Sequence, residues 1–187
     1  MIHVIGYRDP QPTDMPVIET TSHSKTWSRG LSPFFLGPCT LYNNYWSYTV
    51  ENAWQYSKVY SCHLFLGNPS PDYFHWAIAG WSNPRAVRYP MGKGVKPEYS
   101  WWDGSKYKYI EARKNIYIPL YSEAVKKSEA FRELLKLHKE HSDICLLDFD
   151  GYNHIGLGMS LEDVVENPNR SMGHAFVIAL LLEGKIK

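Results

Sequence analysis

The sequence predicts a single α+β domain in which several helices pack around a small sheet. Its 187 residues suit one domain, and a chain of this length buries roughly 70% of the surface that it exposes when unfolded. Short apolar runs predict strands, and apolar residues spaced three and four apart predict helices between them. We expect one domain over residues 1–187, in which residues 1–28 form an N-terminal strand and arm.

Three apolar segments are expected to form strands. The chain opens with a strand-like segment, Met1–Gly6, and a proline-rich loop follows over Asp9–Pro16. Cys39–Tyr42 has the pattern of a strand that runs into an Asn-Asn turn. Ile144–Leu147 is a continuous apolar run, which is typical of a strand buried on both faces. These segments lie far apart in the sequence, so their pairing requires long-range contacts.

Helices are expected between these strands, most of them beginning at a residue that can cap the helix N-terminus. The expected helices run from Thr49 to about Tyr60, from Pro71 to Trp81 after a Ser70 cap, from Tyr107 to Tyr117, from a Ser128 cap onward, and from about Ser171 to Gly184. Pro119 is expected to kink the third helix or to start the next turn. The expected buried faces contain Phe74, Ala77 and Ile78 in the second helix and Phe131, Leu134, Leu135 and His138 in the fourth.

Composition and charge exclude several classes of protein. The formal net charge of +1 provides no broad basic field for nucleic acid, so such a substrate requires a local patch. The three cysteines have no CxxC spacing and are odd in number, which favours a reducing cytoplasm over a disulfide framework. No apolar run approaches the roughly 20 residues of a membrane span, and we expect a soluble protein without a membrane partner. The oligomeric state is left open.

Aromatic residues are unusually frequent, with 7 Trp, 14 Tyr and 7 Phe. Such side chains combine a large apolar area with polar tips. They favour a thick core, and they also suit a pocket that stacks flat rings.

The polar residues Glu51, Gln55 and Lys58 carry the most specific pattern in the chain. On a helix their spacing of i, i+4 and i+7 places them on nearly one side. Glu51 falls in the first turn, where the helix dipole favours a negative charge. This pattern is equally compatible with a solvated helix face.

The segment Trp46–Lys58 resembles the signature of the NADAR superfamily, also called YbiA-like, in which Trp precedes a Thr-Val-Glu triplet followed by Gln and Lys at these spacings. Trp46 lies three residues before Thr49, whereas the family has two. Leu31–Phe35 with Arg29 nearby, Trp102-Asp103 with Arg113, and Ser171–Ala175 are similar to weaker family segments, and His174 replaces a family Lys. The chain also resembles proteins of tailed bacteriophages, for which the host cytoplasm would be the compartment.

This resemblance implies an N-glycosidase that cleaves a ribosyl C–N bond, in ADP-ribosylated guanine of nucleic acid or in a related ADP-ribosyl or phosphoribosyl N-glycoside. A carboxylate such as Glu51 can stabilise the positive charge that develops on the sugar or activate water. Asp148 and Asp150 are the next catalytic candidates because they follow the Ile144–Leu147 strand, although a capped Asp-Gly turn explains them equally. The residues that the resemblance assigns to substrate binding are Arg29, Trp46, Gln55, Lys58, Trp102, Arg113 and His174.

A basic stretch adds a candidate phosphate site. Between Asn83 and Asp103 the chain is rich in Gly, Pro, Lys and Arg, and we expect a long loop in which Arg88 and Lys93 bind phosphate, unless it is simply solvated. The stretch lacks a complete P-loop pattern. No HExxH or paired Cys/His spacing is present, and we expect neither a metal nor a cofactor.

Two further function classes fit the sequence. The first is a binding module that holds ADP-ribose or a nucleotide without turnover, which the changed Trp46 spacing and His174 favour. The second is a phage host-interaction protein whose aromatic excess forms an interface.

Overall fold

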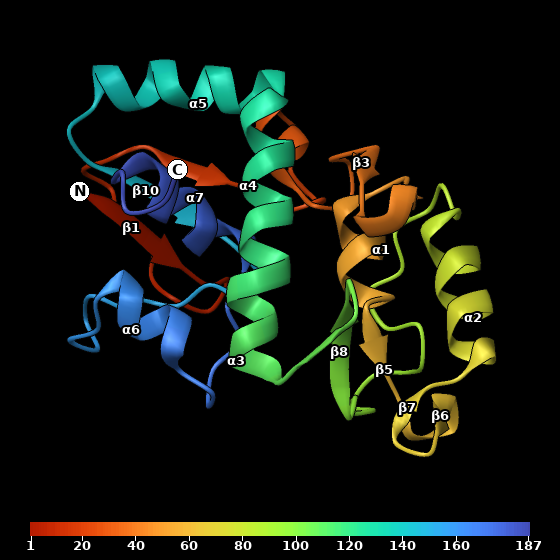
Figure 1. Ribbon diagram of the computed structural model, residues 1–187. Coiled ribbons are helices and arrows are strands. Elements are labelled where there is room, and N and C mark those ends of the chain that lie inside the picture. Colours follow the sequence, from red (N-terminus) through yellow and green to blue (C-terminus); the bar gives the residue numbers. More distant parts are fainter. The chain divides into compact units, whose positions relative to one another are not determined.

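The computed structural model describes all 187 residues and contains two compact units. Unit 1 comprises Met1–Ser32 and Tyr121–Lys187, and unit 2 comprises Pro33–Leu120. Both contain helices and short strands, so the predicted α+β class is confirmed (Figure 1). The assignment of residues 1–187 to a single domain stays a prediction, since one domain can contain two compact units. No helix is long and apolar enough to cross a membrane.

Unit 1 is built on a three-stranded parallel sheet with helices around it (Figure 1). Its strands are β1 (Ile2–Ile5), β2 (Val17–Glu19) and β10 (Ile144–Leu147), in the order β1-β10-β2. Its other elements are the 3-10 helix η1 (Trp27–Leu31) and helices α5 (Glu129–Glu140), α6 (Leu161–Glu166) and α7 (His174–Leu182). Helix α4 (Ile118–Lys127) begins in unit 2 and continues into unit 1.

The central strand β10 confirms the expectation drawn from its apolar run. All four of its residues are buried, and Leu146 pairs with Val4 on one side and Ile18 on the other. Helix α7 packs against β1 and is apolar on nearly all sides, which suits a buried helix (Figure 1). It begins at His174 instead of Ser171, with Gly173 at the N-cap, and stops before Gly184, whose φ of 66° few other residues tolerate.

The cap at Ser128 begins α5 as predicted, and the Ser128 side chain accepts a hydrogen bond from the Phe131 backbone N–H. Phe131 and Leu134 are buried as expected, whereas Leu135 is exposed. The expected kink near Pro119 takes the form of a π-helical turn, η4 (Arg113–Tyr117), between α3 (Tyr109–Ala112) and α4. A proline ring clashes with the carbonyl four residues earlier, and a wider turn avoids that clash.

Unit 2 contains short antiparallel sheets and two further helices. Its helices are α1 (Val50–Gln55) and α2 (Pro71–Trp81), with 3-10 turns η2 (Tyr42–Asn44) and η3 (Ser61–His63). Its sheets are β3 (Cys39–Thr40) with β4 (Trp46–Ser47), β5 (Lys58–Val59) with β8 (Tyr99–Trp102) and β9 (Ser105–Tyr107), and β6 (Leu64–Phe65) with β7 (Asn68–Pro69). Helix α2 has the predicted bounds and its predicted Ser70 cap.

Three expectations for unit 2 were wrong. Helix α1 ends at Gln55 and not near Tyr60, because Lys58 and Val59 pair with β8 instead of continuing the helix. The expected loop from Asn83 to Asp103 is shorter than predicted, since its last residues form strand β8. Ile78, expected on the buried face of α2, is exposed.

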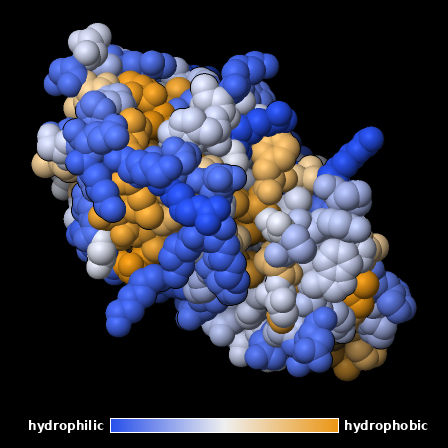
Figure 2. Space-filling view, turned by 90° about the horizontal axis from the view of Figure 1, so that it is seen from above, coloured by the Kyte–Doolittle hydropathy of each residue, from blue (hydrophilic) through white to orange (hydrophobic).

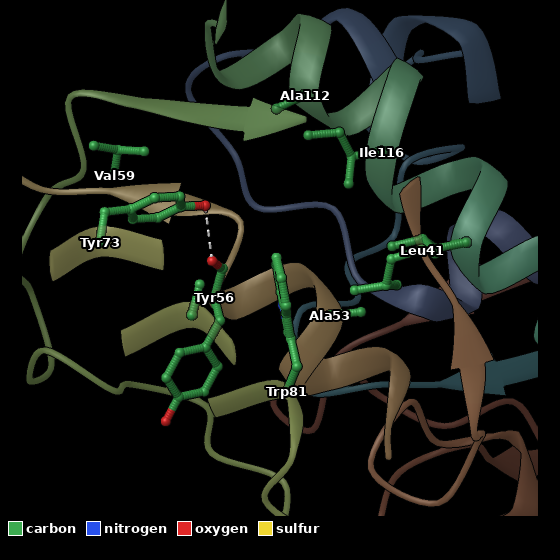
Figure 3. Packing of buried hydrophobic residues seen from close by; sticks show 10 residues of the cluster. Leu41, Ala53, Tyr56, Val59, Tyr73, Trp81, Ala112 and Ile116 are labelled. Carbon is green, nitrogen blue, oxygen red and sulfur yellow. Dashed lines mark hydrogen bonds between the residues drawn. The ribbon is translucent and has the colours of Figure 1, made fainter. Parts of the chain in front are cut away.

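The core of unit 2 is strongly aromatic (Figure 3). Unit 2 contains 21 of the 28 aromatic residues and six of the seven tryptophans. Trp81, Tyr56 and Tyr73 pack here, and the Tyr73 hydroxyl donates to the Tyr56 carbonyl at 3.1 Å (Figure 3). Gly80 allows α2 to approach the Tyr56 ring, which an added Cβ would overlap. Most of the aromatic excess therefore serves as core. On the surface, polar residues dominate the face in Figure 2, with apolar residues exposed in several separate areas.

Candidate functional site

The NADAR-like motif of unit 2 forms a connected chain of polar side chains. Thr49 caps α1 by accepting a hydrogen bond from the Asn52 backbone N–H at 3.1 Å. Glu51, in the first turn, is 5% exposed, and its Oε1 accepts from Gln55 Nε2 at 2.9 Å. Gln55 Oε1 in turn accepts from Lys58 Nζ at 2.7 Å. We call Glu51, Gln55 and Lys58 the Glu51 relay.

The Glu51 relay fixes the orientation of the Gln55 amide. Lys58 can only donate, so the amide oxygen of Gln55 faces it and the amide nitrogen faces Glu51. Lys58 lies on β5 and not on α1, yet it still reaches the relay, and its ammonium lies 4.9 Å from the centre of the Trp54 ring. A carboxylate is thus linked to a cation through a neutral amide.

The first backbone N–H groups of α1 have protein partners. Val50 N–H donates to the Leu36 carbonyl at 2.8 Å, and Glu51 N–H donates to the Pro33 carbonyl at 3.0 Å. The helix dipole still favours a negative charge on Glu51, but these two donors are already used. The chemistry available at this end of the helix is therefore that of the Glu51 side chain.

Asn52, which follows Glu51, fastens α1 to the basic stretch of unit 2. Its Nδ2 donates to the carbonyls of Asn83 and Arg85 at 3.0 and 2.9 Å, and its Oδ1 accepts from the Val87 N–H at 2.8 Å. These contacts hold the first residues of the segment Asn83–Lys96, which we call the basic loop. Asn52 carries no recognisable pattern in the sequence, because its partners are backbone groups more than thirty residues away.

The basic loop carries the predicted phosphate-binding residues. Lys93 is exposed between Gly92 and Gly94, whose φ values of 100° and 88° favour glycine. Arg88 is half-buried, and its guanidinium lies 5.3 Å from the centre of the Tyr89 ring. The loop thus combines cations with a backbone that glycines allow to turn sharply.

The other predicted binding residues of unit 2 each contact an aromatic ring. Trp46, on β4, is 45% exposed and makes an edge contact with Tyr48 at 4.7 Å between ring centres. Trp102, on β8, is half-buried and meets the Tyr42 ring edge-on at 5.0 Å. Arg113 is buried, its Nη2 donates to the Tyr109 hydroxyl at 2.8 Å, and its guanidinium lies 4.6 Å from that ring's centre.

In unit 1 the predicted residues Asp148 and His174 form a buried pair. His174 Nδ1 lies 3.2 Å from Asp148 Oδ2, and the same oxygen accepts from the Ala175 backbone N–H at 3.1 Å. His174 Nε2 lies 2.8 Å from the Thr20 carbonyl oxygen, which can only accept, so Nε2 carries a proton. The pair therefore joins the N-terminus of α7 to the ends of β10 and β2. The prediction that His174 binds substrate stays a prediction.

Asp150 and Arg29 are the remaining predicted residues of unit 1. Asp150 is half-buried, and its Oδ1 accepts from the Ser171 hydroxyl at 3.1 Å. The Gly151 N–H donates to the Asp148 carbonyl at 3.2 Å, which supports the turn predicted at this point. Arg29 is exposed on η1.

The carboxyl edge of the unit 1 sheet carries an aromatic contact that the sequence analysis did not single out. The Tyr7 ring stacks on Phe149 at 4.8 Å between centres. The Tyr7 hydroxyl donates to Glu19 and lies 3.0 Å from the Thr21 hydroxyl. Partial burial and, next, the Glu19 hydrogen bond raise the pKa of Tyr7, so it stays a donor at neutral pH. Ligands of parallel sheets commonly bind at this edge, a signal that led to Asp148 and Asp150 but was not extended to Tyr7 and Phe149.

The structure thus brings together two groups of predicted residues. The Glu51 relay lies in unit 2, and Asp148 with His174 lies in unit 1. The partnership of Glu51 with Asp148 or Asp150 joins residues of different units and stays a prediction. No group of three or more His, Cys, Asp or Glu side chains is arranged to hold a metal ion.

Comparison with known proteins adds no family assignment. No protein-family model matches the chain, and a search of curated proteins found no match. The NADAR resemblance therefore rests on the motif residues themselves.

Proposed function

We propose that the protein is an N-glycosidase-like hydrolase that cleaves the C–N bond at a ribosyl anomeric carbon. The observation that carries the proposal is the Glu51 relay, which combines NADAR motif spacing with a buried, hydrogen-bonded carboxylate. As the bond breaks, positive charge develops on the sugar, and a fixed carboxylate lowers the barrier electrostatically. Water supplies the hydroxyl to the anomeric carbon, and its proton goes to the departing base.

The Glu51 relay suits this chemistry because it holds the carboxylate in one position. Gln55 donates to one oxygen of Glu51, and Lys58 fixes Gln55 in turn. Preorganised groups of this kind need little rearrangement as charge develops. Asp148 and Asp150 are the proposed sources of a second carboxylate.

The proposed substrate is an ADP-ribosyl or phosphoribosyl N-glycoside, including ADP-ribosylated guanine in nucleic acid. Unit 2 has nine Lys and Arg against five Asp and Glu, whereas unit 1 has eleven against fourteen. Cations suit phosphate, and aromatic rings suit a flat base. This excess of cations, together with the basic loop, supports the local basic patch that a nucleic-acid substrate requires.

The alternative is a binding module that holds ADP-ribose or a nucleotide without turnover. Two observations favour it. Trp46, whose spacing departs from the family, is largely exposed, and His174, which replaces the family Lys, is occupied by Asp148 and the Thr20 carbonyl. A host-interaction protein is a third candidate. The exposed tip of the β6-β7 hairpin, where Leu66 is 86% exposed, favours it.

The test is incubation with ADP-ribosylated guanosine, NAD and a ribose-phosphate pyrimidine, followed by chromatography of the products. Release of a free base supports the glycosidase, and retention of an unchanged ligand supports the binding module. If the protein neither releases a base nor retains a ligand, the interaction protein is supported.

Two variants assign the reaction to Glu51. Glu51→Gln keeps the volume but removes the charge, and we expect turnover to fall by roughly 100-fold or more. Glu98→Gln is the matched control, because Glu98 is an exposed carboxylate of the same unit. Turnover that survives Glu51→Gln, or that falls equally in both variants, removes Glu51 from the mechanism. Two carboxylates can supply the required chemistry, so turnover should also survive EDTA.

A further inference from the structure

Asn52 makes three hydrogen bonds to the backbone of a single segment, Asn83–Val87. This segment lies outside the helices and strands. Asn52 is 0% exposed. Both amide N–H groups are donated to carbonyl oxygens, and the amide oxygen accepts from an N–H group, so the amide has one satisfied orientation. This arrangement fixes where the basic loop leaves α2.

The segment that Asn52 holds also contains an internal hydrogen bond. The Asn83 side chain accepts a hydrogen bond from the Arg85 N–H at 2.9 Å, which forms a local turn. The positive φ values of Gly92 and Gly94 lie farther along the loop. The basic loop therefore has an anchored beginning, at Asn52, and a distal part in which glycines set the course of the backbone.

The basic loop has the charge of an anion site. Its fourteen residues include Arg85, Arg88, Lys93 and Lys96 and no Asp or Glu. Asn52 holds the backbone on both sides of Ala86, that is, at Arg85 and at Val87, which precedes Arg88. The first two cations are therefore attached to the segment whose position Asn52 determines.

We propose that Asn52 is a positioning residue that makes α1 and the basic loop one ligand-binding element, in which the loop binds the substrate's phosphate while the adjacent Glu51 faces its glycosidic bond. This inference rests on the proposed function. A phosphate bound by an anchored loop places the ribose at a fixed distance from the Glu51 relay, and such positioning contributes strongly to rate. Asn52 acts through the loop and does not itself contact substrate.

Two variants separate the hydrogen bonds of Asn52. Asn52→Ala removes all three. Asn52→Asp keeps the acceptor for the Val87 N–H but turns an oxygen toward the carbonyls of Asn83 and Arg85, where a donor is needed. The matched control is Tyr73→Phe, which removes the hydrogen bond from the Tyr73 hydroxyl to the Tyr56 carbonyl (Figure 3) and the one to the Ser57 carbonyl, neither of which involves the loop.

The first measurement is amide hydrogen exchange across residues 83–96, which does not depend on catalysis. We expect faster exchange there in both Asn52 variants, and no local change in Tyr73→Phe. The second is affinity for ADP-ribose, with adenosine as the unphosphorylated comparison. Affinity for ADP-ribose should fall about 10- to 100-fold in Asn52→Ala, while affinity for adenosine stays within about threefold.

Where a substrate turns over, KM for it should rise in the Asn52 variants more than kcat falls, which a purely structural loss of folded protein does not produce. Unchanged exchange in the loop, equal weakening toward adenosine, or no binding of ADP-ribose by the wild-type protein would each overturn the role of Asn52. Wild-type protein that binds ADP-ribose but hydrolyses no N-glycoside would sink the glycosidase proposal alone, since the effect of Asn52 on loop and affinity remains measurable.

Discussion

Replacing Asp148 by alanine tests whether the Asp148–His174 pair holds unit 1 together. Asp148 is 2% exposed, and its Oδ2 accepts from the Ala175 N–H and lies 3.2 Å from His174 Nδ1. Asp148→Ala removes this partner from both buried groups. Each buried polar group left without its partner costs about 1–3 kcal/mol, so the loss of both contacts costs about 3–5 kcal/mol in total. We therefore expect the free energy of unfolding to fall by about 3–5 kcal/mol.

Asp148→Asn refines this estimate because it keeps an oxygen in nearly the same place. An amide oxygen can still accept from both groups but lacks the charge of the carboxylate. We expect a smaller loss of about 1–2 kcal/mol, since hydrogen bonds to a charged group are roughly twice as strong as neutral ones. The free energy of unfolding should therefore be highest for the wild type, lower for Asp148→Asn and lowest for Asp148→Ala.

A double-mutant cycle assigns the loss to His174. His174→Phe removes the ring nitrogens, so Asp148→Ala in that background leaves only the Ala175 N–H without its acceptor. The two losses should fall short of additivity by about 1–3 kcal/mol.

Urea unfolding at pH 7, followed by far-UV circular dichroism, measures all four proteins. Tryptophan fluorescence is less suitable, because Trp27 is the sole tryptophan of unit 1. A loss below about 0.5 kcal/mol in Asp148→Ala, or strict additivity in the cycle, would refute the structural role, because surface substitutions usually fall in that range.

Two further predictions concern stability. His154 is buried against Phe176, and burial lowers its pKa below the usual 6.5, so the unfolded chain binds more protons as the pH falls. Stability should decrease as pH falls below about 6.5, and less steeply in His154→Gln, which melting temperatures between pH 7.5 and 5 measure; equal slopes would count against His154. Leu66 begins the β6-β7 turn with φ 50°, next to Gly67 at 76°. Asn tolerates this conformation better, so Leu66→Asn should stabilise by about 0.5–1 kcal/mol in urea unfolding, and a loss of stability would contradict the strain argument.

The elements that the sequence predicted well have local causes. Helix α2 follows from its Ser70 cap and its proline in the first turn, and β10 follows from four consecutive apolar residues. In both cases the signal lies within the element or beside it. Helix α6 was also predictable, because Ser160 and Asp163 form a capping box before its apolar residues, but this pattern was overlooked.

The elements that were missed depend on distant partners. Strand β2 has three residues, and its pairing with β10 joins segments more than a hundred residues apart. Helix α1 was predicted too long because its local pattern continues to Tyr60, whereas the pairing of β5 with β8 overrides that pattern from Lys58 onward. Local propensity is a weak signal when tertiary contacts compete with it.

The contacts of the candidate site also divide into local ones, which the sequence indicates, and distant ones, which it does not. The contact of Glu51 with Gln55 joins residues four apart on α1, as their helical spacing predicted, whereas Lys58 reaches Gln55 from strand β5. Asn52 and Thr20 were missed because Asn52 binds backbone groups of another segment and Thr20 contributes its own carbonyl, so neither contact leaves a pattern in the side chains. His174 was assigned to substrate binding by resemblance, and the Asp148 contact was not foreseen.

The surroundings of Asp148 and Asp150 bear on which of them can assist Glu51. A general base must reach the water from which it takes a proton. Asp148 is buried, and one of its oxygens accepts from the Ala175 N–H and contacts His174 Nδ1, so its contacts serve the packing of α7 on the sheet. Asp150 is less buried and accepts from the Ser171 hydroxyl. Asp150 is therefore the better candidate for a general base, and Asp148→Ala should lower the free energy of unfolding more than it lowers any turnover.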